Sequence, residues 1–179
     1  MNIVAFLQNQ WFQNPDKARE VYAKNPDQRE ELNKRFLFAG CMTGRRLQTA
    51  FGPDLCDQII WEEVSPQIGG KSNSTFPADQ KHISSVIEKH QPDIILTFGS
   101  LAKDALNQWS RDEMYKCEPR PLPVVISGPH PAARYGTVQQ ELWEMRDELL
   151  FKQKDVFGVD VLGRYDYSRK HESTEPASV

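Results

Sequence analysis

The chain has 179 residues, of which 39% are hydrophobic and 26% charged, and its formal net charge is −3 at pH 7. This length favours a single domain whose core is large enough to fold without metals or disulfide bonds. The slightly acidic balance gives no global sign of nucleic-acid binding, although an enzyme that holds a few phosphates needs only a local positive patch.

The cysteines and histidines are too scattered to form a ligand set. Three cysteines lie far apart without CxxC spacing, and the four histidines form no HxH, HxxxH or HExxH pair. We therefore expect no metal site, no iron–sulfur cluster and no other cofactor. The chain starts within an apolar segment and contains no run of 18 apolar residues, which predicts a cytoplasmic protein without a membrane partner.

Apolar runs and amphipathic segments alternate along the chain in the manner of an α/β fold. The apolar runs suit strands buried on both faces of a parallel sheet, and they lie at 3–7, 57–64, within 91–99 and at 123–127. Helical spacing is found at 16–24, 29–36, 45–51, 78–90, 100–109 and 138–152. Asn14 or Asp16 is the expected cap of the first helix, and Thr43 that of the third.

This alternation predicts a three-layer α/β/α sandwich around a central, mostly parallel four-stranded sheet. We expect one domain over residues 1–165, because no repeat or low-complexity block interrupts the pattern. Hydrophobic periodicity fades after it, so residues 166–179 are expected to be a disordered tail.

Polar loops follow all four predicted strands, at 8–12, 63–74, 99–100 and 128–135. The carboxyl ends of parallel strands meet at one edge of a sheet, where open α/β folds bind their ligands. We therefore expect the site there, built of amides, hydroxyls, glycines and one histidine, without an acidic pair, a nucleophile–base pair or a phosphate loop. The chain lacks GxSxG, GxxxxGK[ST] and GxGxxG, which disfavours a serine hydrolase and the nucleotide-binding folds.

Four segments, in order, resemble the uracil-DNA glycosylase superfamily over roughly residues 2–150. Leu7-Gln-Asn-Gln-Trp11 lies where the family has its GQDPYH, GEAPG or GINPG motif, but lacks the glycine and the proline. Phe38-Ala-Gly-Cys-Met-Thr-Gly44 resembles the segment that brings an aromatic side chain into the base pocket. ILTFGSLAKDAL at 95–106 matches the middle strand and helix, and His130-Pro-Ala-Ala matches the closing HPSP-like loop, with alanines replacing Ser and Pro.

The resemblance implies a role for each matched residue. Asn9 would position a water and His130 would donate to the base oxygen, in a reaction that passes through an oxocarbenium-like state. Asparagine cannot take a proton, which implies a slow enzyme or an activated substrate. The expected base pocket comprises Gln8, Trp11, Phe38, Ser65 and Asn73. The expected DNA-binding residues are Arg134, at the position of the family's wedge, together with Tyr135, Ser100 and Lys103.

We therefore expect a monomeric, monofunctional DNA glycosylase that flips out a uracil-type base or a modified cytosine and leaves an abasic site. Its substrate would be duplex or single-stranded DNA, and its setting base-excision repair or defence against modified phage DNA. The alternative is a non-catalytic module that binds nucleic acid or a nucleotide on the same fold. Each residue also has a structural alternative. Asn9 is then a turn residue, His130 an N-cap or a satisfied loop histidine, Arg134 a solvated loop side chain and Phe38 part of the core.

Overall fold

The sheet of the computed structural model contains four strands, and the residues described are 1–71, 75–116 and 121–157. Asn73 and the predicted tail at 166–179 lie outside these residues. The spatial order of the strands is β2-β1-β3-β4, and every described pairing is parallel, so the sheet is all-parallel rather than mostly parallel. The strands are β1 (Ile3–Leu7), β2 (Ile59–Glu63), β3 (Ile94–Phe98) and β4 (Val124–Gly128).

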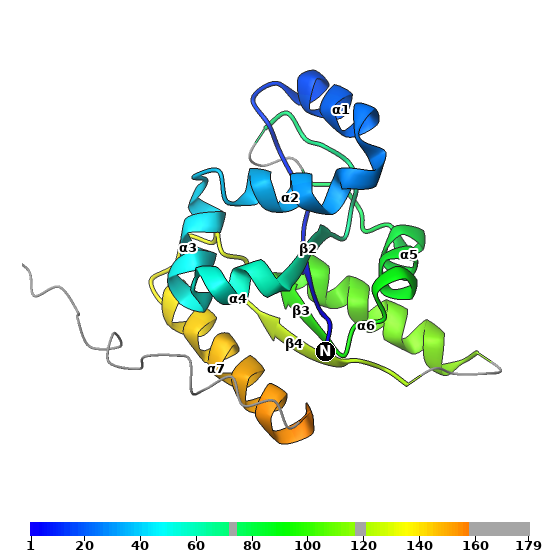
Figure 1. The fold of residues 1–179 in the computed structure, drawn as a ribbon, viewed down its shortest axis with the longest axis vertical. Helices are drawn as coiled ribbons and strands as arrows, with labels where there is room; N and C mark the ends of the chain where they lie inside the picture. The colour runs from blue at the N-terminus through cyan, green and yellow to red at the C-terminus, as the bar shows by residue number, and fades with distance from the viewer. Residues whose placement is uncertain (72–74, 117–120, 158–179) are drawn as a thin grey trace, which may run out of the picture.

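Helices cover both faces of this sheet (Figure 1). One face carries α3 (Met42–Phe51), α4 (Pro53–Gln58) and α7 (Val138–Phe157). The other carries α5 (Gln80–His90) and α6 (Ser100–Met114). None of the helices in the described part of the chain is long and apolar enough to cross a membrane.

Strand β1 is apolar throughout because both of its faces are buried. In β1, Ile3, Ala5 and Leu7 belong to the core under α3, α4 and α7, whereas Val4 and Phe6 belong to the core under α5 and α6. Successive side chains of a strand point to opposite faces, so one five-residue run supplies two cores.

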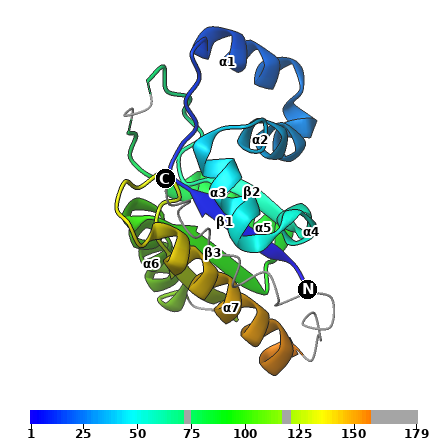
Figure 2. The same cartoon turned by 90° about the vertical axis from the view of Figure 1, so that its left-hand side faces the viewer.

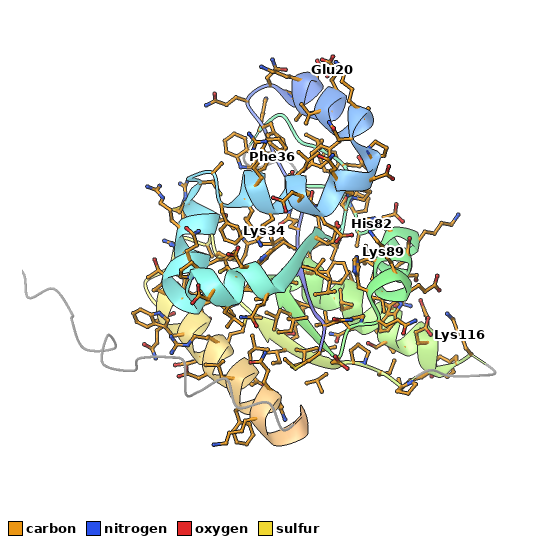
Figure 3. All side chains as sticks on the ribbon, viewed as in Figure 1. Glu20, Lys34, Phe36, His82, Lys89 and Lys116 are labelled. Carbon is orange, nitrogen blue, oxygen red and sulfur yellow. The ribbon has the colours of Figure 1, made fainter. Side chains whose placement is uncertain are left out.

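The remaining helices lie beyond the carboxyl end of β1 (Figures 1 and 2). They are α1 (Pro15–Lys24), the short 3-10 helix η1 (Pro26–Gln28) and α2 (Arg29–Leu37). Phe36 of α2 connects them to the loop after β1, because its ring lies 5.0 Å from that of Phe12 and 5.9 Å from that of Tyr22 on α1 (Figure 3). Helices α1 and α2, with η1 between them, therefore lie next to the edge of the sheet where the site is expected.

Several predicted boundaries were wrong, each for a local reason. The second strand begins at Ile59 rather than residue 57, because Pro53 in the first turn starts the unpredicted helix α4. Cys41, not Thr43, caps α3, since its Sγ accepts from Gly44 N at 3.3 Å. The last two helices run on to Met114 and Phe157. The prediction of Asn14 as the cap of α1 is confirmed, because its side chain accepts from Lys17 N.

Candidate functional site

The four strands end at the same edge of the sheet, and their register brings the predicted site residues of β1 and β2 together. Leu7 pairs with Glu63, and Ser65 N donates to Gln8 O at 3.2 Å just beyond the strands. Continuing this register would pair Asn9 with Ser65.

Asn9 presents an acceptor that no protein group uses. Its Nδ2 donates to the main-chain oxygen of Gln10 at 3.1 Å. That oxygen can only accept, so the amide nitrogen faces it and Oδ1 is turned away. Oδ1 is buried and has no hydrogen-bond partner among the described residues. A buried amide oxygen of this kind is suited to accept from a bound water or substrate.

The other predicted pocket residues near Asn9 differ in their surroundings. Ser65 is 1% exposed, and its Oγ has no partner in the described structure. The half-buried Gln8 lies next to it, joined through its carbonyl. Trp11 is 47% exposed and bridges to Gly69 in the loop after β2, while Phe38 packs edge-on against the buried Trp61 at 5.5 Å. Phe38 is therefore a core contact first, and only its outer edge is left for a ligand.

His130 is held in one orientation at the end of β4. Ala132 N donates to its Nδ1 at 3.1 Å, and Ala133 N donates to its main-chain oxygen at 2.9 Å. Burial lowers the pKa of His130 below the ordinary value of a histidine. The ring is therefore neutral at pH 7, and because Nδ1 accepts, its proton is on Nε2. Nε2 makes no hydrogen bond to the residues described, so it is a free neutral donor.

Gly99 allows β3 and the His130 loop to approach each other closely. Its φ is +89°, and a Cβ added to it would lie 3.0 Å from the Cβ of His130. Its N–H donates to Gly128 O at 2.9 Å, which ties the end of β3 to that of β4. A side chain at this position would be strained in its backbone and would push His130 away.

His130 opens onto a groove of about 570 Å³ between the start of α6 and α7. Three other predicted residues also line it, namely Ser100, Lys103 and Tyr135. The wall formed by α7 is acidic, with Glu141, Glu144 and Glu148. Of the predicted residues that are described, those absent from this lining are Gln8, Asn9, Trp11, Phe38, Ser65 and Arg134. The site thus has two parts, one at the ends of β1 and β2 and one around His130.

The start of α6 forms the positive side of the groove. Its N-cap is Gly99, which supplies no side-chain cap, so the first N–H groups of the helix are free to meet an anion. Ser100 and Lys103 are exposed on the first turn. Arg134 is also exposed and makes no hydrogen bond or ion pair with the described residues. Tyr135, by contrast, donates its hydroxyl to Glu141 Oε2 at 3.1 Å and is tied to α7.

Arg46 of α3 is a site residue that the sequence did not reveal. Its NH1 donates to Pro131 O at 2.6 Å and to Ala133 O at 2.7 Å, which braces the turn that carries His130. The sequence shows two adjacent arginines after Gly44, but nothing in the pattern links either of them to a loop so distant in the chain. Only the packing of α3 against α7 brings Arg46 there.

The expected absence of an acidic pair at the strand ends was wrong. Glu62 and Glu63 end β2 with exposed fractions of 3% and 4%. Burial, and then the neighbouring Glu62 carboxylate, raise the pKa of Glu63 to about 8. Arg29 lies 3.7 Å from Glu62 and 3.8 Å from Glu63, and His82 at the start of α5 lies 3.6 Å from Glu62. The sequence did not indicate a buried acidic pair, because Glu62 and Glu63 directly continue the apolar part of β2.

No cluster of three or more His, Cys, Asp or Glu side chains with the spacing of a metal site occurs within residues 1–71, 75–116 and 121–157. Comparison with protein-family models and with curated proteins gives no match to this chain. The geometry of the strand-end edge therefore carries the functional argument.

Proposed function

We propose that the protein is a monofunctional DNA glycosylase with a uracil-DNA glycosylase-like fold, which hydrolyses the N-glycosidic bond of a flipped-out base. The observation that carries the proposal is His130, a neutral imidazole with its Nε2 proton free at the carboxyl end of β4. The sheet order β2-β1-β3-β4 and the similarity of the strand-end motifs to that superfamily support the same assignment.

Cleavage of an N-glycosidic bond moves negative charge onto the departing base. A fixed donor that meets this charge lowers the barrier, because it stabilises the transition state more than the bound substrate. His130 Nε2–H is such a donor to a base oxygen. A neutral donor also leaves no positive charge buried in the empty site, which would cost free energy before the substrate arrives.

The sugar becomes positive as the base leaves, and a water then completes the hydrolysis. Asn9 Oδ1 is the acceptor that would orient this water, since it is buried and unpartnered among the described residues. An amide does not remove a proton, so Asn9 only positions the water. The water oxygen bonds to the cationic sugar carbon as the bond to the base nitrogen breaks, and the proton that the water loses passes to the anionic departing base. This division of work suits a good leaving group better than an unactivated base.

The start of α6, with Ser100 and Lys103, would hold a phosphate of the DNA at the positive side of the groove. Arg134 would enter the gap that the flipped base leaves in the stack. Trp11, Phe38, Gln8 and Ser65 lie outside the lining of the groove and would contact the base from the ends of β1 and β2, together with Asn73. A groove of about 570 Å³ has room for a substituted pyrimidine. The proposed substrates are therefore a uracil-type base and a modified cytosine. The proposed setting is DNA repair or defence against phage DNA, and we propose that the protein acts as a monomer.

One observation favours a second candidate, a non-catalytic module that binds nucleic acid or a nucleotide. The α7 wall of the groove carries three glutamates, which repel a DNA backbone that approaches from that side. A small nucleotide could still enter from the α6 side.

The two functions are separated by the product. The protein would be incubated with duplex and single-stranded DNAs that contain uracil, 5-substituted cytosines or only normal bases. Abasic sites would be detected by alkaline cleavage, and released bases by mass spectrometry. We expect one modified base to be released by the wild type and not by His130→Ala. Binding without release from any DNA of a broad panel would support the binding module and contradict the glycosylase.

A further inference from the structure

We infer that Gln10 is the residue that orients Asn9, because three side chains fix the Gln10 amide and its main-chain oxygen in turn binds the Asn9 amide. This inference rests on the proposed function, since it concerns the residue that would position the water. It assigns a role to a partly buried polar cluster consisting of Gln10, Tyr22, Asn33 and Glu63, with Trp61 contributing its main-chain oxygen.

The orientation of the cluster starts from a group that can only accept. Asn33 Nδ2 donates to Trp61 O at 3.1 Å, so Asn33 Oδ1 faces the opposite way. Asn33 is 1% exposed and belongs to α2, which packs against β2. Its Oδ1 then accepts from Gln10 Nε2 at 3.1 Å. The sheet therefore dictates which way the Gln10 amide points.

Every polar atom of the Gln10 side chain has a partner. Nε2 carries two hydrogens, one for Asn33 Oδ1 and one for Glu63 Oε1 at 2.5 Å. Oε1 accepts from the Tyr22 hydroxyl at 2.7 Å. The same hydroxyl lies 2.9 Å from Asn33 Oδ1, but it has one proton, and Gln10 Oε1 is nearer and has no other donor among the described residues. A glutamine bonded at all these positions cannot rotate without breaking several bonds in a partly buried place.

The backbone of the same loop is also fixed. Gly69 N donates to Gln10 O at 2.9 Å, and Phe12 N donates to Gly69 O at 2.9 Å, so the loop after β1 pairs with the loop after β2. Gln10 O thus accepts from both Gly69 N and Asn9 Nδ2. Gln10 is therefore fixed both by its side-chain hydrogen bonds and by the backbone pairing with Gly69. The Asn9 Nδ2 group binds the second lone pair of Gln10 O.

These bonds determine which way the Asn9 side-chain amide faces. With Nδ2 bonded to Gln10 O, Asn9 Oδ1 faces the other way and keeps its lone pairs for the substrate side of the loop. If the Gln10 side chain were lost, the loop would gain freedom and the Asn9 amide could turn over. A water bound to Oδ1 would then be displaced or would meet a donor, which a positioned nucleophile does not tolerate.

The test uses Gln10→Ala and Tyr22→Phe, with Tyr115→Phe as the matched control because Tyr115 is 87% exposed on the end of α6. Tyr22→Phe removes the hydroxyl that contacts Gln10 Oε1 and Asn33 Oδ1, and it keeps the ring against Phe36 and under the Arg29 guanidinium, 5.3 Å away. The first readout is the NMR signal of the Asn9 side-chain amide and its hydrogen exchange. The second is the single-turnover rate of base release, measured beside the dissociation constant for DNA.

We expect both variants to shift the Asn9 amide signal and speed its exchange, and the control to leave it unchanged. With a DNA from which the wild type releases a base, Gln10→Ala should lower the single-turnover rate about 10- to 100-fold with little change in DNA affinity. This is the effect expected for a misplaced catalytic group. If Gln10→Ala does not fold, Tyr22→Phe alone decides. An unchanged Asn9 signal in the folded variants overturns the inference. A wild type that releases no base overturns the proposed function instead, and the NMR result still decides the role of Gln10.

Discussion

Replacing His130 by alanine removes a neutral donor that has no hydrogen-bond partner among the described residues. Loss of a single preorganised donor to a developing anion costs about 10²–10³ in rate. We expect His130→Ala to lose base release to this extent and to bind DNA as the wild type does. The check is a single-turnover assay beside a binding titration. Asn9→Ala should resemble it, and a folded His130→Ala protein with the wild-type rate would contradict the assignment.

The pH dependence of the same residue follows from its buried position. Because burial lowers its pKa, His130 stays neutral below the pH at which an exposed histidine becomes protonated, about 6.5. Protonation of Nδ1 would place its hydrogen against the N–H of Ala132 and break the bond that orients the ring. The rate of base release should therefore stay constant as the pH falls to about 6.5 and decline only in more acidic buffer. A decline that begins above neutral pH would point to another group.

Arg46 acts through the turn that it braces, so its effect should depend on geometry rather than on charge alone. Arg46→Ala removes the donor to two partly buried carbonyl oxygens, which costs at most about 1–3 kcal/mol of stability for each of them. Arg46→Lys keeps one charged nitrogen, which could donate to both oxygens as NH1 does, but on a shorter side chain. We expect both variants to slow base release, with lysine recovering part of it. The exposed neighbour Arg45 offers the control, and Arg45→Lys should be silent in thermal unfolding and in rate.

At the scale of elements, the start of α6 and the loop after β4 should divide the work of holding DNA. If Lys103 contacts a phosphate as proposed, Lys103→Ala should weaken binding of duplex and single-stranded DNA alike. Arg134→Ala should weaken duplex substrates more, because an unpaired base needs no replacement in the stack. The measurement is the dissociation constant of each variant for both forms of one sequence. Equal losses for Arg134→Ala on both forms would remove its role as a wedge.

The elements themselves were largely predictable, and the contacts among them were not. Each buried strand showed as an apolar run, and each polar strand end followed from the rule that parallel strands finish at one edge. The boundaries failed where Pro53 started α4 and where Cys41 capped α3. The bonds of Gln10 and Arg46 had no sequence signal, because their partners lie on other elements and side-chain pairing across a fold leaves no periodic pattern.

At the scale of the whole molecule, the buried acidic pair couples stability to pH. Glu63 has a folded-state pKa of about 8, raised from 4.5, so between these values the folded protein binds a proton that the unfolded chain does not. Its contribution therefore favours folding below pH 4.5 and declines as the pH rises through the folded-state pKa. We expect the free energy of unfolding to fall between pH 5 and 8, approximate limits set by this linkage, and Glu63→Gln to flatten the curve. Urea unfolding across this range tests it, and a variant with the wild-type slope would contradict it.

The position of β1 in the sheet also bears on how the protein is made. It is the first strand in the chain, yet it lies between β2 and β3 and pairs with both. During synthesis β1 can therefore pair with its neighbours only after two later segments have been made. Strand β4, which precedes His130, can pair only once β3 is present. Long-range parallel pairing of this kind is slow to form. A ribosome that stopped before β4 would release a chain with Asn9 but without His130, and an exposed edge on β3. Newly made chains should thus depend on chaperones until the last strand is added.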